Sequence, residues 1–215
     1  MTSISEKKRY ELYGRYVAER LGQRGFEAYY ADNSEKALEK AKNLIAETAI
    51  VSFGGSASAE EIGLIESVRK TNKVIDRDKA KNSEERTELM RKALLSDVYI
   101  CGTNAISEDG QLVNIDGTGN RVAAISFGPK EVIIIAGMNK VTKNLEAAVN
   151  RARNIAAPTN MMRFANENST TPCSKTGSCF NCNQNDCICN IITITRRSRI
   201  KGRIKVILVG ESLGF

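Results

Sequence analysis

The chain has 215 residues, of which 41% are hydrophobic and 27% charged, the composition of an ordinary globular domain. It contains no run of about 18 apolar residues and no signal-peptide hydrophobic region. We therefore expect a cytoplasmic protein that does not bind membranes. The absence of histidine excludes histidine acid–base catalysis and histidine metal ligands. The net charge of +7 favours an anionic ligand or partner, but aromatic residues make up only 6% of the chain. With no recognition-helix pattern either, we expect no nucleic-acid binding.

The first predicted element is an amphipathic helix over residues 4–24. Tyr10, Tyr13, Val17 and Leu21 recur at helical spacing, which places them on one face. Glycines close to the end of this segment predict where the helix stops.

The next elements alternate between apolar and helical patterns. We predict an apolar segment at 26–30, a helix at 34–47 and a buried strand at 49–53. Ser58 and Glu61 match the S-x-x-E capping box, so the following helix is predicted to begin directly after Ser58.

The same alternation continues to the C-terminus. Further strands are predicted at 73–76, 98–101, 111–115, 131–136 and 204–209, and further helices at 84–95, 121–127 and 144–156, the last ended by Pro158. Apolar strands alternating with helices predict an α/β fold with a mostly parallel sheet covered by helices on both faces. We expect one domain over residues 1–215, with a cysteine-rich excursion at 165–200 before the last strand.

A glycine-rich turn follows the predicted strand at 49–53. Gly54, Gly55 and Ser56 lie there, and glycines allow backbone amides to approach an anion. In open α/β sheets such turns lie at the carboxyl ends of the strands, where ligands bind. A tight strand–helix connection is the alternative role for this glycine pair.

Polar side chains also follow the later strands and should converge on the same edge of the sheet. They are Asn104, Glu108, Asp109, Asn120, Arg121 and Lys140. We expect a cleft for a carboxylated or phosphorylated small molecule, with Arg121 and Lys140 pairing with the anion. Glu108 or Asp109 is the acid–base candidate, although Asp109 precedes a glycine and fits a plain turn equally well.

Five of the six cysteines fall within seventeen residues, with the spacing C-x5-C-x2-C-x4-C-x-C. They are Cys173, Cys179, Cys182, Cys187 and Cys189. The segment is rich in Asn, Ser, Thr and Gly, so it has few apolar side chains to bury, and a metal is the leading explanation for its order. Four thiolates suit structural zinc and an iron–sulfur cluster equally well, and the spacing does not separate them. A metal-free group of redox thiols is the third alternative. Cys101 ends a predicted buried strand and is expected in the core.

The densest positive charge follows the cysteines directly. It comprises Arg196, Arg197, Arg199, Lys201 and Arg203. This stretch is typical of a solvated basic face, and a docking surface for an acidic partner is the alternative.

Several runs together resemble the LUD-domain (lactate-utilisation) proteins over residues 7–215. The runs are NAISEDGQLVN, GTGNRVAAISFGPKEVIIIAGMNK, AAP…PC…CFNC…C and IKVILVGESLGF. The resemblance implies the NagB/RpiA/CoA transferase-like fold of sugar-phosphate isomerases, glucosamine-phosphate deaminases and CoA transferases. Some members of the family belong to operons for oxidising lactate, alongside iron–sulfur partner subunits, and others have no assigned activity.

The segment 107–110 resembles the Ser-Glu-Asn-Gly loop of family I CoA transferases, with Asp109 in place of Asn. That resemblance would make Glu108 a nucleophile, but a structural or ligand-binding acid is the role we favour. The leading expectation for function is a small-molecule-binding component of organic-acid metabolism, associated with an iron–sulfur oxidoreductase. The alternatives are a stand-alone isomerase or CoA transferase and a non-catalytic scaffold for a redox partner. The sequence leaves homo-oligomerisation open.

Overall fold

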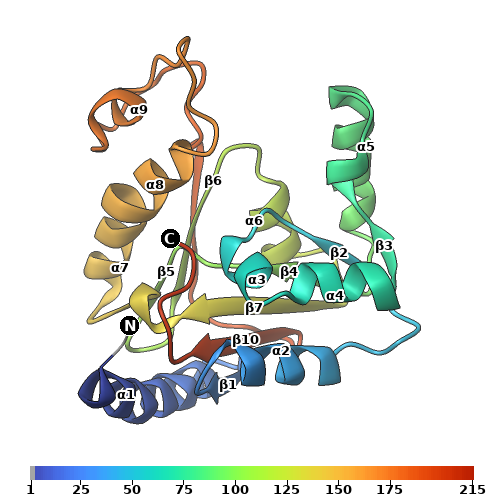
Figure 1. Ribbon diagram of the computed structural model, residues 1–215, viewed down its shortest axis with the longest axis vertical. Coiled ribbons are helices and arrows are strands. Elements are labelled where there is room, and N and C mark those ends of the chain that lie inside the picture. The colour runs from blue at the N-terminus through green and yellow to red at the C-terminus, as the bar shows by residue number, and fades with distance from the viewer. Residues whose placement is uncertain (1–2) are drawn as a thin grey trace.

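A six-stranded parallel sheet forms the centre of the computed structural model, which describes residues 3–215 (Figure 1). The strand order is β1-β10-β7-β4-β2-β3, and every neighbouring pair is parallel. The strands are β1 (Glu27–Ala31), β2 (Ile50–Phe53), β3 (Lys73–Ile75), β4 (Val98–Cys101), β7 (Glu131–Gly137) and β10 (Ile204–Val209). The predicted α/β fold with a mostly parallel sheet is confirmed.

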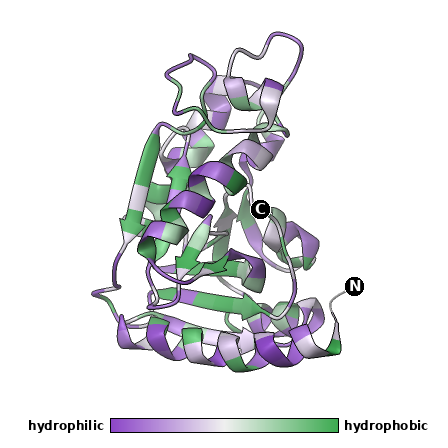
Figure 2. Ribbon diagram, turned by 90° about the vertical axis from the view of Figure 1, so that its left-hand side faces the viewer, coloured by the Kyte–Doolittle hydropathy of each residue, from purple (hydrophilic) through white to green (hydrophobic). Residues whose placement is uncertain are grey.

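Helices cover both faces of this sheet. On one face lie α2 (Ser34–Asn43), α3 (Ala57–Glu61) and α4 (Leu64–Thr71), and on the other lie α1 (Ile4–Gln23), α5 (Ser83–Ala93) and α6 (Asn120–Ser126). Side chains of β7 alternate between the two cores, with Ile133 and Ile135 in the first and Ile134 in the second. Figure 2 shows these apolar strands between helices whose outer faces are hydrophilic. Within residues 3–215, no helix combines the length and the apolar character that crossing a bilayer requires.

A second, four-stranded sheet stands beside the first. Its order is β8-β5-β6-β9, with β5 (Ala105–Ser107), β6 (Leu112–Asp116), β8 (Val141–Thr142) and β9 (Ile191–Thr195). It packs against α7 (Leu145–Arg151), η3 (Ala152–Ala156) and α8 (Ala157–Met161). The sequence did not predict β5, which has three residues, or β9, whose side chains are largely exposed. The cysteine-rich excursion, with α9 (Pro172–Thr176), lies between α8 and β9 at the top of Figure 1.

The predicted capping box at Ser58 and Glu61 is wrong. Ser56 is the N-cap instead, because its Oγ accepts from the backbone N–H of Ala59 at 3.3 Å. Glu61 does not reach back to cap the helix; it accepts from the N–H of Gly214 at 2.8 Å. The helix also ends after one short turn, and Gly63, with φ of 77°, separates α3 from α4.

Pro158 does not stop the helix that precedes it. The chain passes from α7 through the π-helical segment η3 into α8, which has proline in its first turn. Proline lacks the N–H that a continuing helix needs, and the wider π turn accommodates this loss.

We expect Ile134→Ala in β7 to lower the free energy of unfolding by about 3 kcal/mol, because it leaves a cavity in the middle of the sheet. Ile134 is fully buried, whereas Leu95 is 85% exposed and makes Leu95→Ala the matched control. Urea denaturation measures both. Equal effects of the two changes would contradict the central position of β7.

Candidate functional site

A pocket of about 410 Å³ lies at the carboxyl ends of β2, β3, β4 and β7. Its wall holds five cationic side chains and three acidic ones. The cations are Arg77, Arg86, Arg121, Lys140 and Arg163, and the acids are Glu60, Asp78 and Asp116. The pocket therefore carries an excess of positive charge, which favours an anionic ligand.

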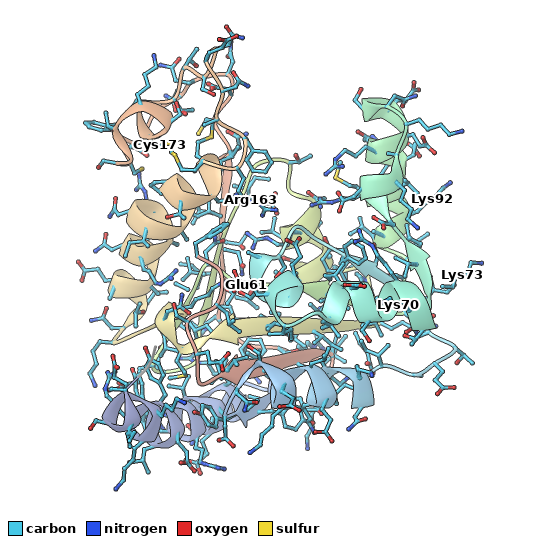
Figure 3. The ribbon with its side chains drawn as sticks, viewed as in Figure 1. Glu61, Lys70, Lys73, Lys92, Arg163 and Cys173 are labelled. Atoms are coloured by element: carbon cyan, nitrogen blue, oxygen red, sulfur yellow. The ribbon has the colours of Figure 1, made fainter. Side chains whose placement is uncertain are left out.

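Gly55 lets two arginines approach the β2–α3 turn. A Cβ at this position would lie 3.2 Å from Nη2 of Arg77 and 3.9 Å from Nη1 of Arg163. Gly54 lies behind the pocket wall, where a Cβ would be 3.0 Å from the hydroxyl of the buried Tyr99. The two glycines thus have different roles: Gly55 lines the pocket and Gly54 permits close packing. Arg163, labelled in Figure 3, lies between the cysteine-rich segment and α3.

Arg121 is held by protein acceptors. Its Nη2 donates to Oδ1 of Asn104 at 2.8 Å and to the carbonyl of Ile115, and its Nε lies 3.6 Å from Asp116. Oδ1 of Asn104 also accepts from the backbone N–H of Ile115 at 2.8 Å. This bond ties the start of β5 to β6. Asn120 can orient a second arginine: with its amide turned so that the oxygen faces Arg77, that oxygen accepts from Nη1 of Arg77 at 2.9 Å.

Lys140 is the most unusual group in the pocket wall. It comes from η2 (Met138–Lys140), directly after β7, and only 4% of it is exposed. Its Nζ donates to Oγ of Ser58 at 2.9 Å, and within residues 3–215 no carboxylate lies within 4.0 Å of it. Burial, with the nearby charges of Arg151 and Arg121, lowers the pKa of Lys140 from 10.5 to about 7.

Glu108 lies outside the pocket. Its carboxylate accepts from Nζ of Lys143 at 2.7 and 3.0 Å and from the hydroxyl of Tyr13 at 2.9 Å. The bond from Lys143, followed by the one from Tyr13, lowers the pKa of Glu108. These contacts tie the hairpin of β5 and β6 to α1, and the predicted catalytic role stays a prediction.

Asp109 also lies outside the pocket and pairs with Arg24. Gly110, which follows it, has φ of 88°, and a Cβ there would meet the backbone N of Leu21 at 2.8 Å. The turn therefore allows the hairpin to approach α1 closely. The observed role of Asp109 is thus to pair with Arg24, and its acid–base role stays a prediction.

The five clustered cysteines line a second, smaller cavity of about 50 Å³. All are free thiols, and Cys101 is also free but lies in the core, as predicted. Burial and the neighbouring thiols of Cys187, Cys179 and Cys173 raise the pKa of Cys189 to about 12. Across residues 3–215, no three Cys, Asp or Glu side chains are already arranged to hold a metal ion. The predicted metal site therefore stays a prediction.

The family model of the LUD domain matches residues 15–209. The chain belongs to the LUD domain family.

One solved structure agrees with this LUD domain in fold over nearly its whole length, and others are similar over about half of it. A DUF162 family protein from Deinococcus radiodurans is similar over 93% of this chain and 97% of its own, with 12% identity and a TM-score of 0.51. Ribose 5-phosphate isomerase A from Methanocaldococcus jannaschii covers 52% of this chain and 55% of its own, with 18% identity and a TM-score of 0.34. The Plasmodium falciparum ribose 5-phosphate isomerase covers 50% and 51%, with 16% identity and a TM-score of 0.33. Comparison with the curated proteins gives no match.

The pocket of this LUD domain contains residues that the sequence did not single out. Arg77 follows β3, so the strand-end rule that selected Lys140 could also have found it. Arg163 follows α8 and reaches the pocket from the helices that cover the second sheet. No local sequence pattern indicated that Arg163 would lie there. Of the predicted ligand-binding residues, the pocket brings together Gly55, Ser56, Asn104, Asn120, Arg121 and Lys140.

We expect the stability difference between the wild type and Lys140→Met to depend on pH. The folded state releases the lysine proton near pH 7, whereas the unfolded chain keeps it up to the ordinary value of 10.5. The wild type should therefore gain about 1.4 kcal/mol per pH unit relative to the variant between these values, and nothing below pH 7.

Urea denaturation at a series of pH values measures this difference. The matched control is Lys73→Met, which removes an exposed lysine at the start of β3, on the outer side of the sheet in Figure 3. A difference between the wild type and Lys140→Met that stays flat from pH 7 to 10 would contradict the expected titration.

Proposed function

We propose that this LUD domain binds a small organic acid in the 410 Å³ pocket, as a component of lactate-like organic-acid metabolism. Membership of the family supports a role related to lactate utilisation in general. The chemistry of the pocket supports a carboxylated or phosphorylated small molecule as the ligand of this chain.

The observation that carries the proposal is the position of Lys140. A buried ammonium group is costly unless a negative charge pairs with it. Lys140 lines the pocket and is 4% exposed, and within residues 3–215 its one hydrogen-bond partner is the neutral hydroxyl of Ser58. A carboxylate or phosphate in the pocket would supply the missing charge and raise the pKa of the lysine again.

Two further cations can share the ligand. Arg77 and Arg163 both lie close to Gly55, and their nearest acids, Asp78 and Glu60, are 3.9 and 4.0 Å away. Apart from Nη1 of Arg77, which faces Asn120, these long contacts leave guanidinium donors available to an anion. The volume exceeds the needs of a three-carbon acid alone, so a longer or phosphorylated acid also fits.

Isothermal titration with lactate, pyruvate and inorganic phosphate tests the proposal. We expect at least one of these anions to bind, and Lys140→Met to weaken it about tenfold or more, since one charged hydrogen bond contributes roughly 1.5–3 kcal/mol. Lys73→Met should leave the affinity unchanged. Equal affinities for the wild type and Lys140→Met would contradict the proposed role of this lysine.

The affinity should also depend on pH. Because the anion pairs with the protonated lysine, binding should be tightest below pH 7 and weaken as the pH rises above the free-state pKa of about 7. The same titration repeated between pH 6 and 9 measures this. Affinity that rises with pH would show that the ligand prefers the neutral amine.

The basic connection between β9 and β10 favours a second part of the proposal, an acidic redox partner such as an iron–sulfur oxidoreductase subunit. Arg196, Arg197 and Arg199 are exposed there. Arg203 is not part of this surface, because its guanidinium donates to the carbonyls of Ile125 at 2.8 Å and Ala124 at 2.9 Å.

Co-purification from the native cell tests this partner. We expect reversal of the three exposed charges to glutamate to abolish the complex, because the attraction between the two surfaces is electrostatic. Arg203 is left intact in this variant because it holds the end of α6. A complex that survives the reversal would contradict this part of the proposal.

A further inference from the structure

The cysteine-rich segment has almost no core of its own. Between residues 165 and 190 only Thr171 is buried, and the only helix or strand described there is the five-residue α9. Phe180, the one aromatic side chain in that range, is 64% exposed. Hydrophobic burial therefore does not account for a defined conformation of this segment.

The side chains that this segment directs toward its inner cavity include all five of its cysteines. Five thiols from three separate stretches of the segment meet at one cavity of about 50 Å³. Pro158, Met161 and Ile192 form its apolar wall, and Arg153 also lines it. No carboxylate from residues 3–215 lines this cavity. The anionic donors that the cavity offers are therefore all thiols, beside the neutral side chains of Thr171 and Asn181 and the cation of Arg153.

The backbone is shaped for thiolate ligands at both cysteine pairs. Between Cys179 and Cys182, Asn181 has φ of 52°, a left-handed conformation that folds the C-x2-C turn tightly. At the second pair, the backbone N–H of Cys189 donates to Sγ of Cys187 at 3.4 Å. An N–H directed at sulfur stabilises a thiolate, the form of cysteine that binds metals.

We propose that four of the five clustered thiolates bind a single zinc ion, which closes the cysteine-rich segment over the second sheet. Sulfur ligands select zinc or iron–sulfur clusters and reject magnesium and calcium. The small cavity, of about 50 Å³, favours a single ion over a four-iron cluster, which places eight atoms between its thiolate ligands. Within residues 3–215 no three of these side chains are already set around one point, so zinc binding would require the thiols to move together.

The zinc site would also fix one wall of the larger pocket. Ile188, between two of the cysteines, lines that pocket, and its backbone lies 3.4 Å from where a Cβ of Gly117 would be. Asn190 donates to the carbonyl of Gly117 at 3.0 Å. This consequence for ligand binding rests on the proposed function, whereas metal content and thiol reactivity do not, so the two proposals fail independently.

Elemental analysis and acid-labile sulfide determination on the full chain, purified without oxygen or chelators, test the zinc site. We expect about one zinc per chain and neither iron nor sulfide. Cys179→Ser combined with Cys182→Ser should lose the zinc, and Ser178→Ala, an exposed change in the same segment, should keep it. Iron with sulfide, no metal at all, or a double variant that retains its zinc would overturn the proposal.

Thiol titration of the wild type gives a test that needs no variant to fold. With zinc bound, one of the five clustered thiols should react with a disulfide reagent in the native protein, and all five should react after zinc is removed with a chelator. Cys101 is fully buried and should stay unreactive in both states. Five reactive clustered thiols before the chelator is added would overturn the proposal.

Discussion

The buried end of β7 determines where the charged group of the pocket lies. This strand pairs with β10 on one side and β4 on the other, and both of its faces are covered. At Gly137 the chain turns, and only glycine fits there, because a Cβ would lie 2.4 Å from Oδ1 of Asn139 and 2.5 Å from the N of Leu213. The turn becomes η2, whose last residue, Lys140, is thereby held inside the protein and at the pocket wall.

The segment after β10 closes over the same turn. The N–H of Leu213 donates to Oδ1 of Asn139 at 3.2 Å, and the carbonyl of Leu213 accepts from the hydroxyl of Ser58. The same hydroxyl accepts a hydrogen bond from Nζ of Lys140. Glu61 accepts from the N–H of Gly214 at 2.8 Å. The lysine is therefore enclosed by β7, by α3 and by the C-terminal segment, and it lines the pocket. A cation held in this position is a preformed group for anion binding.

The fold could be read from the sequence because its central strands are continuous apolar runs. EVIIIA at 131–136 and IKVILV at 204–209 carry apolar side chains on both faces of the strand. Such strands are stable when both faces of the sheet are covered by helices. The errors arise where distant contacts decide the local structure. Ser58 fits a helix cap by spacing, but Lys140 and Leu213 occupy its hydroxyl, and Ser56 caps the helix instead.

The same limit applies to the site. Strand-end residues were predictable because parallel strands carry their carboxyl ends to one edge, and Lys140 and Asn104 lie in the pocket for that reason. Glu108 follows a strand of the second sheet and lies against α1 instead, because Tyr13 and Lys143 hold it there. Arg163 could not be predicted, since its place in the pocket depends on how two separate layers meet.

The most direct measurement is the titration of the lysine side chains by NMR, with ¹³C-labelled lysine, in the free protein and with a saturating organic acid. We expect one lysine, absent in Lys140→Met, to titrate near pH 7 in the free protein, and its midpoint to move upward when the anion binds. If every lysine titrates near its ordinary value, or if the midpoint of Lys140 does not move with any bound anion, the buried lysine is not the anion-binding group of this pocket.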